Sequence, residues 1–117
     1  MWQALYLPDA EAERQKLAPA ERVALDHAVK KLEELGPDLG FPHSSAVQGL
    51  PGGLRELRPR RGRGPYRAIY RRVNDVFIIA SVCPEAVKDP RGFRRGCADA
   101  LNRLAEVDVT AEEGKRS

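Results

Sequence analysis

Residues 54–82 read LRELRPRRGRGPYRAIYRRVNDVFIIASV, and this stretch contains most of the predicted sheet. Short runs rich in β-branched and aromatic residues alternate with Gly, Pro, Asn and Asp, which is typical of strands joined by tight turns. The predicted elements are a strand at 54–59, a turn at 62–65, a strand at 66–72, a turn at 73–75 and a strand at 76–82. Together these three strands form an antiparallel meander, in which the most apolar strand is the last.

The same stretch concentrates the positive charge of the chain. Residues 55–72 contain eight arginines and one acidic residue, Glu56, and therefore have a net charge of +7. Residues 1–54 sum to −3 and residues 73–117 to −1, which gives the total of +3. A sheet would hold these guanidinium groups in place, and guanidinium binds phosphate and carboxylate groups through paired hydrogen bonds. The pattern predicts a protein that acts on a polyanion, and nucleic acid is the first hypothesis.

Upstream of the meander, the sequence predicts a strand and two helices. Residues 2–7 form the strand, Asp9 caps a short helix that ends at Leu17, and Pro19 suits the first position of a second helix. One apolar stripe lies along that second helix, at Leu25, Ala28, Val29, Leu32 and Leu35. Residues 36–53 hold five glycines and three prolines and predict a surface loop.

Downstream, Asp89 and Pro90 open a C-terminal helix. Its apolar face is formed by Phe93, Cys97, Ala100, Leu101 and Leu104. The fold class is α+β: an N-terminal strand, a helical hairpin, the meander and a last helix. We expect one domain over residues 1–106 and a frayed tail over residues 107–117.

Composition narrows the class of protein further. The longest apolar run, residues 76–80, is too short to span a membrane, and the N-terminus lacks the pattern of a signal peptide, so we expect a cytoplasmic protein. Cys83 and Cys97 are expected to be reduced thiols, with Cys97 on a buried helix face. No spacing of metal ligands and no phosphate-binding glycine loop is visible, so we expect no cofactor.

Two short motifs connect the chain to a known family. Gly53-Leu54-Arg55-Glu56-Leu57-Arg58 and Tyr66-Arg67-Ala68-Ile69-Tyr70, at this spacing and in this order of elements, resemble the RelE/ParE superfamily of bacterial toxins. The phage-derived HigB-like branch is the most similar, and the resemblance covers roughly residues 1–106.

The resemblance implies a toxin that pairs with an antitoxin, expected to be a small helix-turn-helix protein. In the RelE and HigB branches the activity is cleavage of mRNA on the ribosome, whereas ParE toxins inhibit DNA gyrase. The chain departs from the HigB-like pattern at one place. The Lys-Lys pair that usually follows the last strand is replaced by Pro84-Glu85, which leaves only Lys88 nearby.

Cleavage of RNA by its own 2′-OH needs a proton acceptor, a proton donor and positive charge around the phosphate. The resemblance places Arg58 and Arg67 on the substrate-facing side of the sheet, with Arg67 as the main phosphate clamp. Glu56 is either a general base or the cross-strand ion-pair partner of Arg67 or Arg71. Lys88 either holds the leaving phosphate or faces solvent.

The remaining basic residues predict a surface that contacts RNA. Arg60, Arg61 and Arg63 lie in or beside the turn, where they would bind the RNA backbone without sequence preference. Arg55 and Arg71 extend this surface, and Tyr66 either stacks on a base or packs in the fold. Tyr70 is expected in the core.

The histidines leave one further alternative. His27 lies off the apolar stripe and is expected to face solvent, whereas His43 would supply a missing acid or base if its loop folded over the sheet. Three functions stay open: a ribosome-dependent, metal-independent mRNA endonuclease, a non-catalytic toxin that binds a protein such as gyrase, and a decayed member that only binds RNA.

Overall fold

The computed structural model describes residues 1–116, with side chains described as far as residue 108, and Ser117 lies outside the described residues. The elements in chain order are β1 (Gln3–Tyr6), α1 (Pro8–Gln15), α2 (Pro19–Leu35), the 3-10 helix η1 (Gly36–Asp38), β2 (Ser44–Ala46), β3 (Arg55–Leu57), the 3-10 helix η2 (Pro59–Gly62), β4 (Tyr66–Val73), β5 (Val76–Pro84) and α3 (Pro90–Arg116). The α+β class and the order of helices and long strands confirm the prediction.

The strands form one five-stranded sheet in the order β1-β5-β4-β3-β2. β3, β4 and β5 are the predicted antiparallel meander, in which Glu56 pairs with Ile69 and Arg67 with Cys83. β1 runs parallel to β5, with Leu5 opposite Ile78. Because β5 pairs with β1 on one side and with β4 on the other, the most apolar strand lies inside the sheet.

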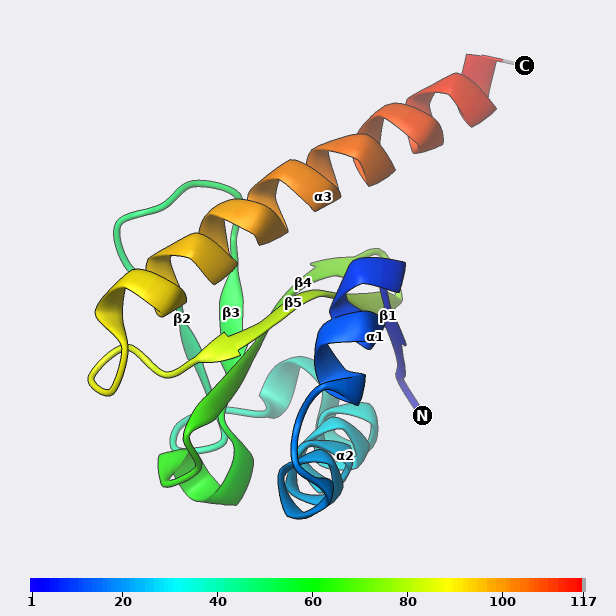
Figure 1. The fold of residues 1–117 in the computed structure, drawn as a ribbon. Coiled ribbons are helices and arrows are strands. Elements are labelled where there is room, and N and C mark those ends of the chain that lie inside the picture. Colours follow the sequence, from blue (N-terminus) through cyan, green and yellow to red (C-terminus); the bar gives the residue numbers. More distant parts are fainter. Residues whose placement is uncertain (117) are drawn as a thin grey trace.

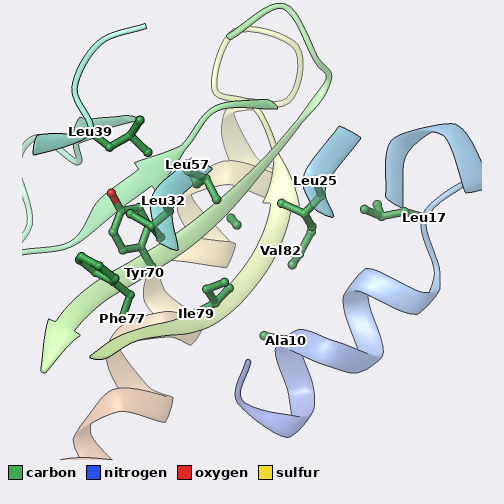
Figure 2. Close-up of a cluster of buried hydrophobic side chains, with 11 residues drawn as sticks. Ala10, Leu17, Leu25, Leu32, Leu39, Leu57, Tyr70, Phe77, Ile79 and Val82 are labelled. Carbon is green, nitrogen blue, oxygen red and sulfur yellow. The ribbon is translucent and has the colours of Figure 1, made fainter. Parts of the chain in front are cut away.

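Helices cover both faces of this sheet (Figure 1). α1 and α2 pack against one face through a cluster that includes Leu25, Leu32, Tyr70 and Ile79, and Figure 2 draws these side chains over the strands, with the front of the chain cut away. The other face packs against α3, through a second cluster that is built from Ile69, Ile78, Ala80, Cys83, Cys97, Ala100 and Leu104. Because side chains alternate along β4, Ala68 and Tyr70 face the first cluster and Ile69 faces the second.

The sequence explains where the helices begin and end. Each α-helix starts with a proline, which has no N–H to leave unpaired in the first turn. α2 ends at Gly36, which has a φ of +59°. A Cβ at Gly36 would collide with the indole ring of Trp2, so this position needs glycine for both backbone and space. Within the described residues, no helix combines the length and the apolar composition needed to cross a bilayer.

The structure corrects the prediction between the second helix and the meander. Residues 36–53 were expected to be a loop, but they contain η1 and the edge strand β2. The strand expected at 54–59 is shorter, because Pro59 opens η2, and the strand expected at 76–82 continues to Pro84. β2 exists because Ser44 pairs with Leu57 and bonds to the Tyr70 hydroxyl, 2.6 Å away, rather than because of its own sequence.

The C-terminal helix extends past the predicted domain boundary. α3 continues to Arg116 (Figure 1), whereas a frayed tail was expected from residue 107. The last residue of that predicted tail, Ser117, lies outside the described residues. The division into a domain over residues 1–106 and a tail therefore stays a prediction.

Candidate functional site

Arg67, predicted as the main phosphate clamp, is buried. Only 3% of its surface is exposed. Its Nη1 donates hydrogen bonds to the carbonyl oxygens of Gly64 and Tyr66, at 2.8 and 3.0 Å, and its Nη2 donates to the Gly62 carbonyl oxygen at 3.0 Å. The guanidinium therefore holds the β3–β4 connection in place. The predicted substrate-facing position of Arg67 is wrong.

Glu56 joins the two arginines that were predicted to act together. Its Oε1 accepts a hydrogen bond from Arg58 Nη1 at 2.8 Å and one from Arg67 Nε at 3.2 Å. The side chain of Glu56 is 13% exposed. This arrangement confirms the cross-strand ion pair with Arg67, and it leaves Glu56 neutralised by two cations.

Arg58 lies where this buried ion pair meets the surface. Its Nε donates to the Pro42 carbonyl oxygen at 3.1 Å, and its guanidinium lies 5.2 Å from the centre of the Phe41 ring. A side chain at Gly62 would approach Arg58 Nη2 to 2.6 Å, so the connection passes tightly over the guanidinium. One edge of Arg58 thus faces the fold and another faces a surface hollow.

The hollow lies between α2 and η2 and has a volume of about 330 Å³. We call it the α2–η2 hollow. Its lining residues are Ala20, Val23, Ala24, His27, Ala28, Lys31, His43, Arg58, Arg60 and Arg61. Four of these side chains are cationic and none is acidic. The structure therefore gathers part of the predicted basic surface around one concave site, and adds residues of α2 that were not predicted.

Arg60 and Arg61 reach the hollow from an unusual backbone. Their φ values are +55° and +59°, in the left-handed region, where a non-glycine residue costs roughly 1–2 kcal/mol. Arg60 is fixed by an ion pair in which its Nη1 donates to both carboxylate oxygens of Glu21, at 2.7 and 2.9 Å. The Arg61 side chain has no such anchor among the described residues and stands exposed at the rim.

His27 and Lys31 were not predicted as site residues. They are one helical turn apart on α2 and lie on its outward side, as expected for His27. His43 lies within the predicted loop and faces the same hollow, where burial lowers its pKa, assisted by the positive charges of Lys31 and Arg61. The i, i+4 spacing of His27 and Lys31 indicates that they share one face of the helix. It does not indicate that this face lies opposite the β3–β4 connection.

Lys88 and Tyr66 lie at a different place. They line a second cavity of about 380 Å³, together with Pro65, Pro84 and Asp89. This cavity shares no lining residue with the α2–η2 hollow. The structure therefore brings Lys88 to Tyr66, but it does not bring Lys88 to Arg58.

The remaining predicted residues are scattered around the sheet. Arg55 Nε donates to Ser44 Oγ at 3.0 Å, and Arg71 Nη2 donates to both carboxylate oxygens of Asp108 on α3. Arg63 is exposed after η2. Tyr70 is 1% exposed, which confirms its predicted place in the core. Among the described residues, no three His, Cys, Asp or Glu side chains gather closely enough to hold a metal ion.

Comparison with known proteins identifies relatives of this fold. The family model described as phage-derived protein Gp49-like (DUF891) matches residues 12–83, which is more than half of the chain. No curated protein sequence matches the chain.

Solved structures of RelE toxins share the fold. A free-state mutant of Escherichia coli toxin RelE, in which two arginines are replaced by alanine, has a TM-score of 0.63 and 19% identity, and the match covers 88% of this chain and 97% of that one. The toxin–antitoxin complex RelBE2 of Mycobacterium tuberculosis has a TM-score of 0.57 and 18% identity, covering 72% and 98%. The archaeal RelE–RelB complex of Pyrococcus horikoshii has a TM-score of 0.52 and 24% identity, covering 71% and 93%. At these identities the likeness establishes the fold alone, and this fold is the one that the resemblance in the sequence predicted.

Proposed function

Because this chain belongs to the phage-derived Gp49-like family, we propose that it is the toxin of a toxin–antitoxin pair and cleaves mRNA on the ribosome. Its fold is that of RelE, a toxin, and two of the similar structures are complexes with an antitoxin. Under this proposal the chain acts in the cytoplasm, and its partner is a small helix-turn-helix antitoxin. An acidic segment of that antitoxin would neutralise the arginine-rich surface.

One observation supports RNA as the target. The fold gathers Arg58, Arg60 and Arg61 around a single hollow, and no acidic side chain lines it. Guanidinium groups held in this way stabilise the additional negative charge on a phosphate that is attacked by a neighbouring 2′-OH. Of the predicted residues, Arg58 is the best placed for this role, since it is anchored on one edge and faces the hollow on the other.

The roles of the other predicted residues follow from their contacts. Arg67 is a positioning residue, because it holds the connection on which Arg60 and Arg61 lie. Glu56 fixes the orientation of Arg58. Tyr66 and Lys88, which line the second cavity, would contact a neighbouring nucleotide through stacking and phosphate binding.

The test uses a translating bacterial extract that contains end-labelled mRNA. Purified chain, freed of antitoxin, is expected to produce new RNA ends only when ribosomes are engaged. Arg58→Ala should lose this cleavage, whereas Arg94→Ala, an exposed arginine on α3, should retain it. Intact mRNA with folded protein would refute the endonuclease proposal.

A second candidate function is a non-catalytic toxin that binds a protein target such as gyrase. The observation that favours it is the turn before α3, where Pro84-Glu85 replaces the basic pair of the HigB-like branch. The Glu85 carboxylate accepts hydrogen bonds from the backbone N–H groups of Val87 and Lys88. Glu85 therefore stabilises the turn, and it does not provide the positive charge that the basic pair would bring to a phosphate. Inhibition of gyrase supercoiling by the purified chain, together with intact mRNA, would support this candidate.

A further inference from the structure

We propose that the α2–η2 hollow binds a backbone phosphate of single-stranded RNA. Lys31 of α2 and Arg61 of η2 are the two unpaired cations that bind this phosphate. This inference names the substrate group and the binding site. It rests on the RNA-directed function proposed above. The site is distinct from the buried Glu56–Arg67 pair and from the cavity at Lys88.

Charge is the first support for this site. Lys31, Arg58, Arg60 and Arg61 all line the hollow, together with His27 and His43. Arg58 and Arg60 are fixed by carboxylates of Glu56 and Glu21, respectively. Lys31 and Arg61 are exposed and form no ion pair with the described side chains. Two fixed and two unpaired cations around one concavity favour an anionic ligand.

The shape of the hollow is the second support. Ala20, Ala24 and Ala28 follow one another at four-residue intervals on α2, so the helix presents small side chains to the hollow. Larger side chains at these positions would fill the space between α2 and η2. The volume of about 330 Å³ accommodates a phosphate and its attached sugar.

The backbone of η2 is the third support. Arg60 and Arg61 occupy left-handed conformations that glycine adopts without strain. Strained conformations of this kind cluster at binding sites, where the side chain is needed in place. Arg60 also contacts Glu21, but Arg61 makes no contact that would explain an arginine at this position within the described fold. An anionic ligand would explain it.

An RNA segment is favoured over an acidic peptide by Phe41. This ring is 77% exposed and lies against the Arg58 guanidinium, 5.2 Å from its centre. An exposed aromatic face beside an arginine offers a stacking surface to a base, which a carboxylate-bearing peptide does not use. The phosphate would enter the hollow while the adjoining base lies at Phe41.

The first experiment measures binding without ribosomes. A fluorescein-labelled single-stranded RNA octamer is titrated with the full chain over a series of KCl concentrations. Lys31→Ala is compared with Lys30→Ala, because both lysines are exposed on α2 but only Lys31 lines the hollow. Loss of one phosphate contact is expected to reduce the slope of log K against log[salt] by about 0.7. Equal slopes and affinities for the two variants would overturn the proposal.

A second experiment locates the anion. In a titration with inorganic phosphate, the ring C–H signals of His27 and His43 are expected to shift and to saturate, and Lys31→Ala should weaken that response. Signals that stay unchanged would place phosphate elsewhere, and an equal response in Lys31→Ala would overturn the assignment of Lys31 as a ligand. Binding of poly-glutamate with an affinity equal to that of the RNA would also overturn the assignment to RNA.

These results separate the site from the proposed function. Suppose that Lys31→Ala and Arg61→Ala cleave mRNA on ribosomes and bind the octamer as well as the parent chain does. This result would refute the phosphate site in the hollow and retain the proposed endonuclease activity. Octamer binding that depends on Lys31, together with intact mRNA on ribosomes, would refute the endonuclease activity and retain the assignment of the hollow as a phosphate-binding site.

Discussion

The Nε atom of Arg67 lies 3.2 Å from Oε1 of Glu56 on the neighbouring strand, and this pair is almost enclosed by the β3–β4 connection. The family resemblance predicted a substrate-facing arginine at this position, but the contacts of Arg67 are those of a structural one. Backbone carbonyl groups of the connection accept the other hydrogen bonds of the guanidinium. The pair therefore links the sheet to η2.

Replacement of Arg67 by alanine is expected to destabilise the fold. The change would leave carbonyl groups of Gly62 and Gly64 without their hydrogen bonds and remove a buried cation. Loss of one partner of a buried pair costs about 3–5 kcal/mol. Urea denaturation measures the effect, with Arg63→Ala as the control, because Arg63 is exposed and such changes usually stay within about 0.5 kcal/mol. Equal midpoints for the two variants would contradict the structural role.

Replacement of Arg61 by glycine should separate stability from function. Glycine removes a left-handed strain of roughly 1–2 kcal/mol but adds freedom of about 0.5–1 kcal/mol to the unfolded chain. We expect Arg61→Gly to leave stability unchanged or raise it by up to about 1.5 kcal/mol, while RNA binding weakens.

The matched control for Arg61→Gly is Arg63→Gly. Arg63 has an ordinary φ of −85°, so glycine brings no relief of strain there and is expected to lower stability. Thermal unfolding of both variants provides the comparison. A greater loss of stability in Arg61→Gly than in Arg63→Gly would show that the left-handed conformation of Arg61 is not strained.

Local patterns were sufficient for most of the fold. The prolines that open α2 and α3, the stripe through Leu25 and Leu32, and the apolar run in β5 each act within a few residues, and these elements formed close to where they were expected. The first helix was also expected, but it begins at Pro8 rather than after a capping Asp9, and it ends at Gln15 rather than Leu17. β2 was missed because its pairing partner and the Tyr70 hydroxyl are distant in sequence. Such contacts leave no periodicity in the strand itself.

The candidate site was less predictable, for the same reason. The sequence indicated which residues are basic, but not which of them would form ion pairs within the fold. Arg67 and Arg71 are engaged by groups of the chain itself, at Glu56 and Asp108, whereas Arg61 stays exposed. The α2 residues that complete the hollow lie about 30 to 40 residues before η2. Only the packing of α2 against η2 brings the two groups together.

Arg103 of α3 is predicted to anchor that helix to the sheet. Its Nη1 donates to Glu13 Oε1 of α1 at 3.0 Å and to the Ala80 carbonyl oxygen of β5 at 2.8 Å. Glu13 also accepts the Val82 N–H, at 3.0 Å. Arg103→Met keeps most of the apolar stem but loses these bonds, and we expect a cost of about 1.5–3 kcal/mol.

Hydrogen exchange measures that loss of anchoring. Amides of β5 near Val82 and of the first half of α3 should exchange faster in Arg103→Met. Arg95→Met is the control, since Arg95 is also on α3 but is exposed. Similar protection in the two variants would show that the contacts of Arg103 contribute little to the attachment of α3.

The two buried thiols predict how stability depends on pH. Burial raises the pKa of Cys97 to about 11 and raises the pKa of Cys83 as well, with the neighbouring Cys97 adding to the effect at Cys83. In the unfolded chain a thiol ionises near pH 8.5. Between that pH and about 11 the unfolded state therefore binds fewer protons than the native state, so the free energy of unfolding must fall as pH rises. Urea titrations at pH 8 and pH 10 measure this fall, which should be smaller in Cys97→Ala. An equal fall in Cys97→Ala and in the parent chain would show that this thiol ionises alike in both states.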